Sequence, residues 1–237
     1  MANTGASLTR PDGMKGIVAD WSSDQRAFKD VPWGKAMMWI FLLSDTFIFS
    51  CFLLSYMTVR SSTTVPWPNA SEVFALHIGG QDVPLILIAI MTFILITSSG
   101  TMAMAVKFGY ERKRRITAIL LIVTALLGAS FVGMQAFEWT KLIMEGVRPW
   151  GNPFGAPQFG STFFMITGFH GTHVTIGVIF LFIVARKVWR GDYDVDNDRR
   201  GFFTSRKGNY EIVEVTGLYW HFVDLVWVFI FAFFYLW

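Results

Sequence analysis

The sequence is poor in the residues that build disulfide frameworks, metal centres and charged surfaces. Its 237 residues include one Cys and four His. Only 16% are charged, against about 25% in an average soluble domain. A single Cys excludes an intramolecular disulfide, a C-x-x-C redox pair and any metal or iron–sulfur site built from several cysteines. The hydrophobic share of 53% and the mean hydropathy of +0.46 exclude a disordered chain and argue against a soluble globular domain.

The chain has five long apolar runs instead. A helix needs about 20 apolar residues to cross the hydrocarbon core of a bilayer, and no run has a Lys or Arg in its interior. Because backbone groups in lipid must be hydrogen-bonded within the protein, runs of this length favour helices over barrel strands. The fold prediction is therefore all-α, a polytopic transmembrane bundle of five helices. The runs lie at about 33–59, 83–106, 116–139, 160–185 and 215–237.

Basic residues are divided unevenly between the connections. Seventeen of the 20 Lys and Arg residues lie before the first run, between the second and third, or between the fourth and fifth. Only Arg60, Lys141 and Arg148 lie on the other side. The positive-inside rule then predicts a cytoplasmic N-terminus and a periplasmic C-terminus in a bacterial cytoplasmic membrane. The same distribution explains the pI near 9.1 without a nucleic-acid partner.

The chain divides into two parts. Residues 1–32 are polar and lack the apolar stretch of a signal peptide, so we expect a polar cytoplasmic segment there. Residues 33–237 form the five-helix membrane domain. The sequence contains no Gly-x-Ser-x-Gly elbow, phosphate-binding Gly loop with Lys, or His-Glu-x-x-His pattern. We therefore expect no catalytic residue, metal or bound cofactor in this chain.

Asp45 is the most unusual ionisable residue of the first run. It lies about 18 Å beyond Trp33 if the run is helical, near the middle of a bilayer. A carboxylate at that depth costs at least about 2.5 kcal/mol, so it faces protein or water or is protonated. Two interpretations remain: an acid linked to a proton or a lipid, or a protonated acid bonded to a neighbouring helix.

His170 and His173 lie three residues apart in the fourth run and therefore on one helix face. Two ligands do not make a metal site, and a carboxylate from another helix would be needed. Small residues nearby, such as Gly168 and Gly171, favour close helix packing. We predict that both histidines form hydrogen bonds between helices and that neither binds a metal.

The last run begins with a strip of polar residues. His221 and Asp224 are three residues apart, so a pair between their side chains is feasible, and Glu214 lies two turns earlier on the same face. The strip could dock a neighbour or hold water near a proton entry, or it could be a hydrogen-bond ladder that fixes the bundle. Glu138, at the end of the third run, is interpreted as an interfacial polar anchor.

Two long segments carry a family resemblance. Residues 160–177 read GSTFFMITGFHGTHVTIG, and residues 219–231 read YWHFVDLVWVFIF. Both resemble the signatures of subunit III of the haem–copper respiratory oxidases. The segments Leu43 to Asp45, Ser98 to Gly100 and Leu127 to Glu138 are similar to further parts of that family. The matches lie in the family's order and cover residues 33–237.

The resemblance implies a role that the residues alone do not. Members of the family carry no redox centre and pack against subunit I, which holds the haems and copper, alongside subunit II. They support proton uptake, protect the enzyme from inactivation during turnover and bind phospholipids. We therefore expect a non-catalytic subunit III of a proton-pumping terminal oxidase, with cytochrome c as the expected donor. A quinol oxidase subunit III and a nitric oxide reductase accessory subunit are the alternatives.

The chain departs from the family in three places. Many members have seven spans, and this chain lacks the first two, which puts the family's lipid cleft in doubt. The buried acid of the first shared span is commonly Glu, and here it is Asp45. A His pair of many members is replaced by Lys107-Phe108. A different class, a proton-coupled transporter using Asp45 with His170 or His173, is disfavoured because transporters usually contain internal repeats.

Overall fold

The computed structural model describes residues 33–74, 76–78, 81–83, 85–194 and 210–237. Five of its helices are long and apolar enough to cross a membrane, which confirms the predicted number of spans. The predicted cytoplasmic segment 1–32 lies outside the described residues. The long helices are α2 (Trp33–Ser62), α4 (Ile86–Tyr110), α5 (Arg114–Met144), α6 (Gln158–Arg190) and α7 (Glu211–Phe231), which continues as the π-helix η1 (Ala232–Leu236).

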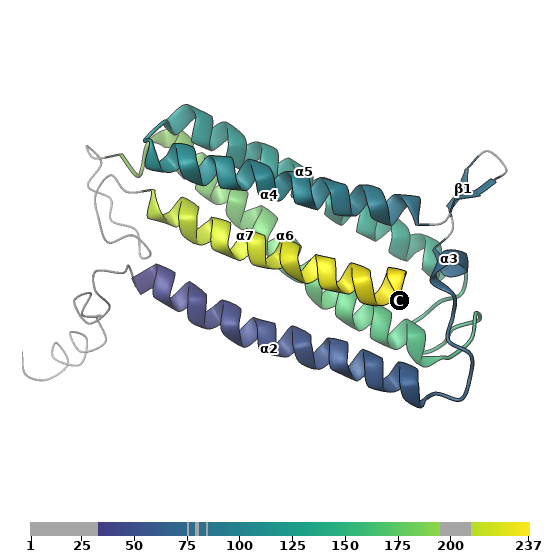
Figure 1. The fold of residues 1–237 in the computed structure, drawn as a ribbon. Helices are drawn as coiled ribbons and strands as arrows, with labels where there is room; N and C mark the ends of the chain where they lie inside the picture. The colour runs from purple at the N-terminus through teal and green to yellow at the C-terminus, as the bar shows by residue number, and fades with distance from the viewer. Residues whose placement is uncertain (1–32, 75, 79–80, 84, 195–209) are drawn as a thin grey trace, which may run out of the picture.

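The connection between α2 and α4 adds a detail that the all-α prediction missed. A short helix α3 (Ala70–Val73) is followed by two antiparallel strands, β1 (Leu76–Ile78) and β2 (Gln81–Val83). Asn69 caps α3, because its side-chain oxygen accepts hydrogen bonds from the Ser71 backbone N–H and hydroxyl. The hairpin projects from one end of the bundle (Figure 1), so it leaves the helical membrane domain unchanged.

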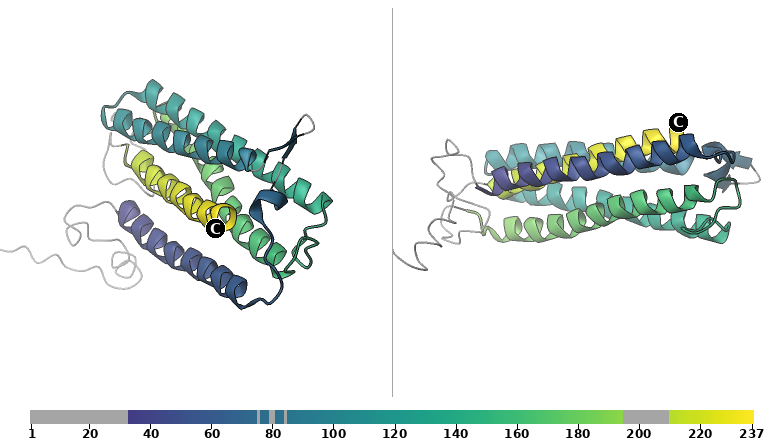
Figure 2. Two further views of the ribbon diagram at one scale, coloured as in Figure 1. Left: turned by 45° about the vertical axis from the view of Figure 1, so that its right-hand side comes forward. Right: turned by 90° about the horizontal axis from the view of Figure 1, so that it is seen from below.

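Helices α4 to α7 form a four-helix bundle, and α2 is added to its side. Each of α4, α5, α6 and α7 packs on its neighbour in the chain, and α7 also packs on α4, which closes the bundle. Helix α2 packs on α7 and α6. In Figure 1, α7 therefore lies between α4 and α2, and Figure 2 shows α6 in a different layer from α2 and α7.

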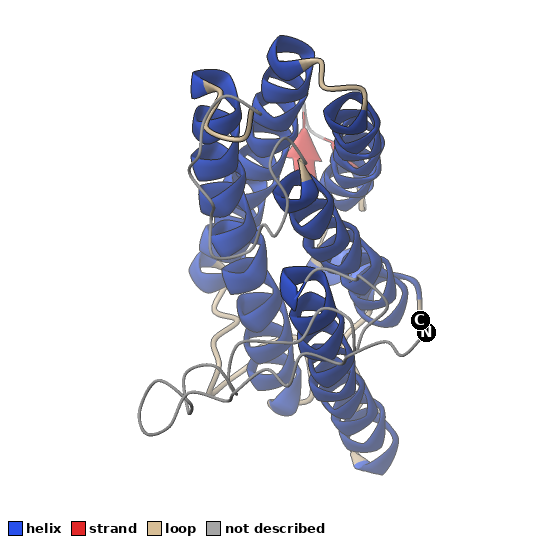
Figure 3. Ribbon diagram, turned by 90° about the vertical axis from the view of Figure 1, so that its left-hand side faces the viewer, coloured by secondary structure: helices blue, strands red, loops and turns tan. Residues whose placement is uncertain are grey.

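The antiparallel helices bring the basic connections together. The start of α2, the turn between α4 and α5, the end of α6 and the start of α7 all lie at one end, which Figure 3 views. We call it the basic end, because the described residues there include Lys35, Lys107, Arg112 to Arg115, Arg186, Lys187 and Arg190. The other end, with the hairpin and residue 237, is the opposite end.

The centre of the bundle is built around Trp220 of α7. A Cβ at Gly128 of α5 would lie 2.4 Å from its indole ring, and one at Gly177 of α6 would lie 3.0 Å from it. Only glycine lets three helices approach this closely. The Trp220 indole N–H donates to the Ser98 hydroxyl of α4 at 3.0 Å. One side chain thus joins all four helices of the bundle.

Helix α2 turns a single stripe towards the bundle. Its buried residues recur every three or four positions, which is the spacing of one helix face. Its other hydroxyl groups, such as those of Thr46 and Ser50, donate to main-chain carbonyls one turn earlier, so they do not face lipid unpaired. The buried stripe consists of Leu42, Asp45, Phe49, Leu53 and Tyr56.

Candidate functional site

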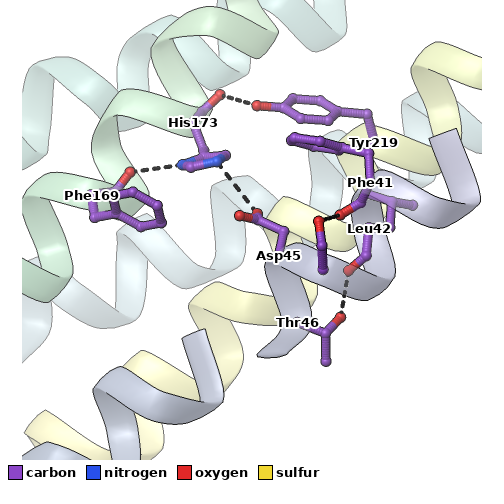
Figure 4. Close-up of polar contacts among 8 residues, drawn as sticks. Phe41, Leu42, Asp45, Thr46, Phe169, His173 and Tyr219 are labelled. Carbon is purple, nitrogen blue, oxygen red and sulfur yellow. Dashed lines mark hydrogen bonds and ion pairs between the residues drawn. The ribbon is translucent and has the colours of Figure 1, made fainter. Parts of the chain in front are cut away.

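The predicted site residues Asp45 and His173 meet between α2 and α6 (Figure 4). The Nε2 atom of His173 lies 3.3 Å from Oδ2 of Asp45, an ion-pair contact. Asp45 is buried, and His173 is partly buried. The other ring nitrogen, Nδ1, lies 2.9 Å from the main-chain oxygen of Phe169. Asp45 is therefore in contact with a neighbouring helix, although its Oδ2 makes no well-aligned hydrogen bond to a described residue.

This geometry restricts where protons can lie. A carbonyl oxygen only accepts hydrogen bonds, so Nδ1 of His173 carries a hydrogen that it donates to Phe169. Nε2 then faces Asp45 in one of two forms. Either the neutral imidazole faces a protonated carboxyl group, or the imidazolium faces a carboxylate. Both forms hold one proton between the two side chains and have no net charge, which an apolar interior tolerates best.

Aromatic side chains enclose the Asp45–His173 pair. The Tyr219 hydroxyl of α7 donates to the main-chain oxygen of His173 at 2.9 Å, and its ring stacks on Phe41 of α2. The rings of Phe169 and Phe49 contact the imidazole, with centroid separations of 4.7 Å and 5.7 Å. The pair is thus held by three helices, α2, α6 and α7, and is shielded by apolar surface.

His170 does not behave as predicted. Its side chain is buried, and neither ring nitrogen has a hydrogen-bond partner among the described residues, so the predicted bond between helices is wrong. Its ring stacks on Trp227 of α7 at 5.5 Å and meets the edge of Phe131 of α5 at 6.0 Å. One turn from the Asp45–His173 pair, His170 therefore packs as an aromatic ring.

Glu214 belongs to a separate cluster at the basic end. Its carboxylate accepts a hydrogen bond from the Lys35 ammonium of α2 and another from the Tyr110 hydroxyl of α4. It makes no hydrogen bond or ion pair with His221, although both lie on one face of α7. Sequence reasoning missed Lys35 and Tyr110 as partners, because each lies at the end of a different helix and only the fold brings them together.

His221 and Asp224 lie between α7 and α4 and do not pair with each other among the described contacts. Nδ1 of His221 lies 2.6 Å from the Ser99 hydroxyl of α4. Asp224 lies near Ser99 too, but neither of its carboxylate oxygens makes a well-aligned hydrogen bond to a described residue. Two consecutive residues of α4, Ser98 and Ser99, thus form hydrogen bonds with two consecutive residues of α7, Trp220 and His221.

Glu138 is not an interfacial anchor, because its side chain is buried inside the opposite end of the bundle. Its carboxylate accepts a hydrogen bond from Gln135 at 2.7 Å and from the Tyr235 hydroxyl of η1 at 3.2 Å. The sequence prediction failed because it rested on the position of Glu138 at the end of the third apolar run. The partner that buries it, Tyr235, lies almost 100 residues away.

Arg60 was also missed as a functional contact. It ends α2 at the opposite end, donates to the main-chain oxygen of Trp237 at 2.7 Å and lies 4.2 Å from the centre of that indole ring. Across the described residues, no three His, Cys, Asp or Glu side chains are grouped to hold a metal ion. The polar side chains of the interior instead contact one another in pairs and small clusters between helices.

A further cluster lies outside the membrane spans, where α6 is connected to α7. Asp194 accepts hydrogen bonds from Arg114 of α5 at 3.0 Å and from the Tyr210 hydroxyl at 2.5 Å. Burial, followed by the hydrogen bond and the charge of Asp194, raises the pKa of Tyr210 above its ordinary value near 10. Gly191, with a φ of +79°, ends α6 where a side chain would collide with Arg114.

The fold and its contacts define a polytopic membrane protein whose interior polar groups link its helices. A sequence profile for cytochrome c oxidase subunit III matches residues 25–237. The chain therefore belongs to the cytochrome c oxidase subunit III family, which confirms the resemblance drawn from residues 160–177 and 219–231.

Bacterial relatives agree with this assignment. Proteins from Staphylococcus epidermidis and Staphylococcus aureus, each named "Probable quinol oxidase subunit 3", are 31% identical to this chain over 198 residues. A protein of the same name from Staphylococcus saprophyticus is 30% identical over the same length. Each match covers 84% of this chain and 86% of the relative.

Proposed function

We propose that this chain is the non-catalytic subunit III of a proton-pumping haem–copper terminal oxidase in a bacterial cytoplasmic membrane. Haems and copper would lie in subunit I, and this chain would hold no redox centre. One observation carries the proposal beyond family membership. The residues of the family signatures contact one another: Tyr219 bonds to His173, Trp220 to Ser98 and His221 to Ser99. Their contacts hold helices together, which suits a subunit that supports a catalytic neighbour.

The electron donor of the complex is proposed to be a quinol. The family resemblance alone favoured cytochrome c, but the three relatives above are named as quinol oxidase subunits. The donor site itself would lie on other subunits of the complex. Subunits I and II and membrane phospholipids are the proposed partners, and the basic end is proposed to face the cytoplasm.

The Asp45–His173 pair is proposed to hold a proton that supports proton uptake by subunit I. Passing this proton on leaves one negative charge on the pair, so a second proton must arrive in the same step to keep the apolar interior neutral. A transporter is less well supported, because neither a cavity between α5 and α6 nor the cavity between α4 and α7 described below is lined by Asp45 or His173. The pair lies between packed aromatic rings instead of along a central cavity.

Purification through an affinity tag on this chain tests the assignment. After mild detergent extraction, we expect reduced-minus-oxidised haem bands and a large polytopic subunit identified by its mass. Oxygen uptake with a quinol, and its absence with reduced cytochrome c, would support the proposed donor. Reduction of nitric oxide in place of oxygen would overturn the oxidase assignment. A colourless chain that migrates alone, even when extracted directly into lipid nanodiscs, would overturn the association itself.

Substitution of Asp45 in the purified complex tests the proton role. Asp45→Asn keeps a hydrogen-bonding group of similar size but cannot exchange the carboxyl proton with His173. We expect slower turnover or a shorter active lifetime with normal assembly, and partial rescue by Asp45→Glu. Unchanged turnover and lifetime in Asp45→Asn would leave the pair a structural contact.

A further inference from the structure

A second polar site lies in a groove between α4 and α7, away from the Asp45–His173 pair. The groove contains a cavity of about 230 Å³. It lies between α4 and α7, two helices that run side by side in Figure 1. The residues that matter here are Ile96, Ser99, His221, Asp224, Leu225 and Val228.

The base of this α4–α7 groove contains hydrogen-bonding groups that this chain leaves unused. Asp224 is only 8% exposed and lies near Ser99, but neither carboxylate oxygen makes a well-aligned hydrogen bond to a described residue. The ring of His221 is fixed by Ser99 through Nδ1, and its Nε2 makes no hydrogen bond to a described residue. The groove therefore offers an acid and an imidazole, one turn apart, to something outside the chain.

The depth of these groups makes a partner necessary. Asp224 lies thirteen residues into α7, about 20 Å from the basic end. An unpaired carboxyl group at that depth costs several kcal/mol in hydrocarbon, so such groups normally face a protein partner or water. The rim is apolar, since Ile96, Leu225 and Val228 are all exposed. A polar centre inside an apolar rim is typical of an interface between membrane helices.

We propose that the α4–α7 groove is the surface on which a transmembrane helix of the haem-bearing subunit docks. That helix would place a hydrogen-bond donor, a cationic or hydroxyl side chain, opposite Asp224 and His221 and cover the rim with apolar residues. This inference rests on the proposed function, because it assigns the surface through which that association occurs. Charge complementarity selects the occupant: the unused groups include an acid, and an acid needs a donor.

The other occupants of such a groove fit less well. A lipid carries its donors in the headgroup, whereas Asp224 lies about 20 Å along the helix, at the level of the acyl chains. A second copy of this chain would meet the groove with the same groove, because a twofold contact is self-complementary. Two Asp224 carboxyl groups would then lie in one apolar groove, where like acids repel each other when ionised.

Site-specific photo-crosslinking in the intact complex tests the docking surface. Leu225 and Leu126 form a matched pair: they are 55% and 56% exposed, and they lie at similar depth on α7 and α5. A photoreactive benzoyl-phenylalanine would replace each in turn, in membranes that contain the whole oxidase. We expect crosslinks to the haem-bearing subunit from position 225 and none from position 126.

The possible outcomes separate this inference from the proposed function. A crosslink from position 126 and not 225, or from 225 only to lipid or to a second copy, overturns the docking surface while the complex still purifies with haem. If purification of the unsubstituted chain recovers no haem-bearing subunit, that result overturns the proposed function itself. Crosslinking leaves Asp224 in place, so it does not depend on a variant of that residue that folds.

Variants of Asp224 then test the chemistry of the contact. Asp224→Leu removes both acceptors, and Asp224→Asn keeps one. We expect Asp224→Leu to speed loss of the haem-bearing subunit in detergent by about threefold to tenfold, the range of single polar contacts between membrane helices. Asp224→Asn should lie between Asp224→Leu and the parent chain. Equal dissociation rates for all three would show that the donor contact is absent.

Discussion

Helix α2 and the α4–α7 bundle are held in place by different means. In the most apolar 18-residue stretch of the last helix, α7 with η1, 50% is buried inside the protein. In the corresponding stretch of α2, only 22% is buried. Helix α2 is fastened by polar contacts at three levels instead. Lys35 pairs with Glu214 at the basic end, Asp45 pairs with His173 in the middle, and Arg60 bonds to residue 237 at the opposite end.

The difference teaches how a helix can be positioned without a large packed interface. Lipid tails are as apolar as Leu, so an apolar stripe alone does not fix the rotation or height of a helix. The bundle overcomes this through close approach at glycines, as at Gly128 and Gly177 around Trp220. Beyond Gly34 at its start, helix α2 contains no glycine, and its three polar contacts specify its height and rotation.

The largest expected effect comes from adding a side chain at a glycine where two helices of the bundle approach closely. Gly128→Val would drive a side chain into the Trp220 ring, since even a Cβ would lie at 2.4 Å. Overpacking of this kind costs about 1–3 kcal/mol or more, so we expect aggregation or a large loss of thermal stability in detergent. Gly133→Val on the same helix is the control, because nothing lies within 4 Å of its Cβ position. Equal behaviour of the two variants would contradict close packing at Trp220.

A smaller effect is expected at the middle contact of α2. A double-mutant cycle with Asp45→Ala and His173→Ala should give a coupling energy of about 0.6 kcal/mol, the average for polar contacts in membrane proteins, and at most about 1.7 kcal/mol. Unfolding in mixed micelles measures it. The pair Asp45→Ala and His170→Ala provides the control, and its coupling should be near zero because His170 contacts no described polar group.

The two end contacts of α2 should differ in their response to salt. Lys35 and Glu214 are partly exposed ions, so their pairing should weaken as salt rises. The guanidinium of Arg60 also lies over the indole ring of residue 237, so its contact depends less on opposite charge. Lys35→Met should therefore destabilise by about 0.5 kcal/mol at low salt and by less at high salt. Arg60→Met should show the same loss at both. A reversed salt response would refute this assignment.

The smallest effect concerns Tyr210 beside the bundle. Its pKa is raised in the folded chain, so the phenol stays protonated where an unfolded chain would ionise. Stability is thus fully present below pH 10 and is lost as pH rises through the folded value. Asp194→Asn should lower the pH at which phenolate absorbance appears, and Tyr210→Phe should remove that component. An unchanged titration in Asp194→Asn would show that Asp194 does not perturb Tyr210.

The sequence predicted more of the fold than of the contacts at the candidate site. Apolar runs report length and hydrophobicity, which determine how many helices cross a membrane, and all five were found. Each helix extends a few residues beyond its run at one end or both, as α6 does to Arg190, because the polar ends remain helical. The short hairpin β1–β2 was missed, because six residues of strand carry no clear alternation.

Pairing between side chains of different helices depends on how one helix is rotated against the other. The spacing of residues within one helix gives no information on that rotation. The spacing of His221 and Asp224 allowed a pair, yet His221 bonds to Ser99 of α4. The same spacing put His170 beside His173, but α2 supplies an acid to only one of them. Glu138 was misplaced for a similar reason, because Tyr235 reaches it from another helix.

The π-helical turn at the end of α7 has a consequence for the contacts of its own residues. In η1 each backbone hydrogen bond spans one more residue than in an α-helix, so the turn is wider and the side chains that follow are rotated. This phase shift lets neighbouring residues serve two helices: Tyr235 bonds to Glu138 of α5, while the Phe234 ring packs on Tyr56 of α2 at 4.2 Å. Deleting one residue here would restore α-helical phase, and the last turn could then satisfy only one of its two neighbours.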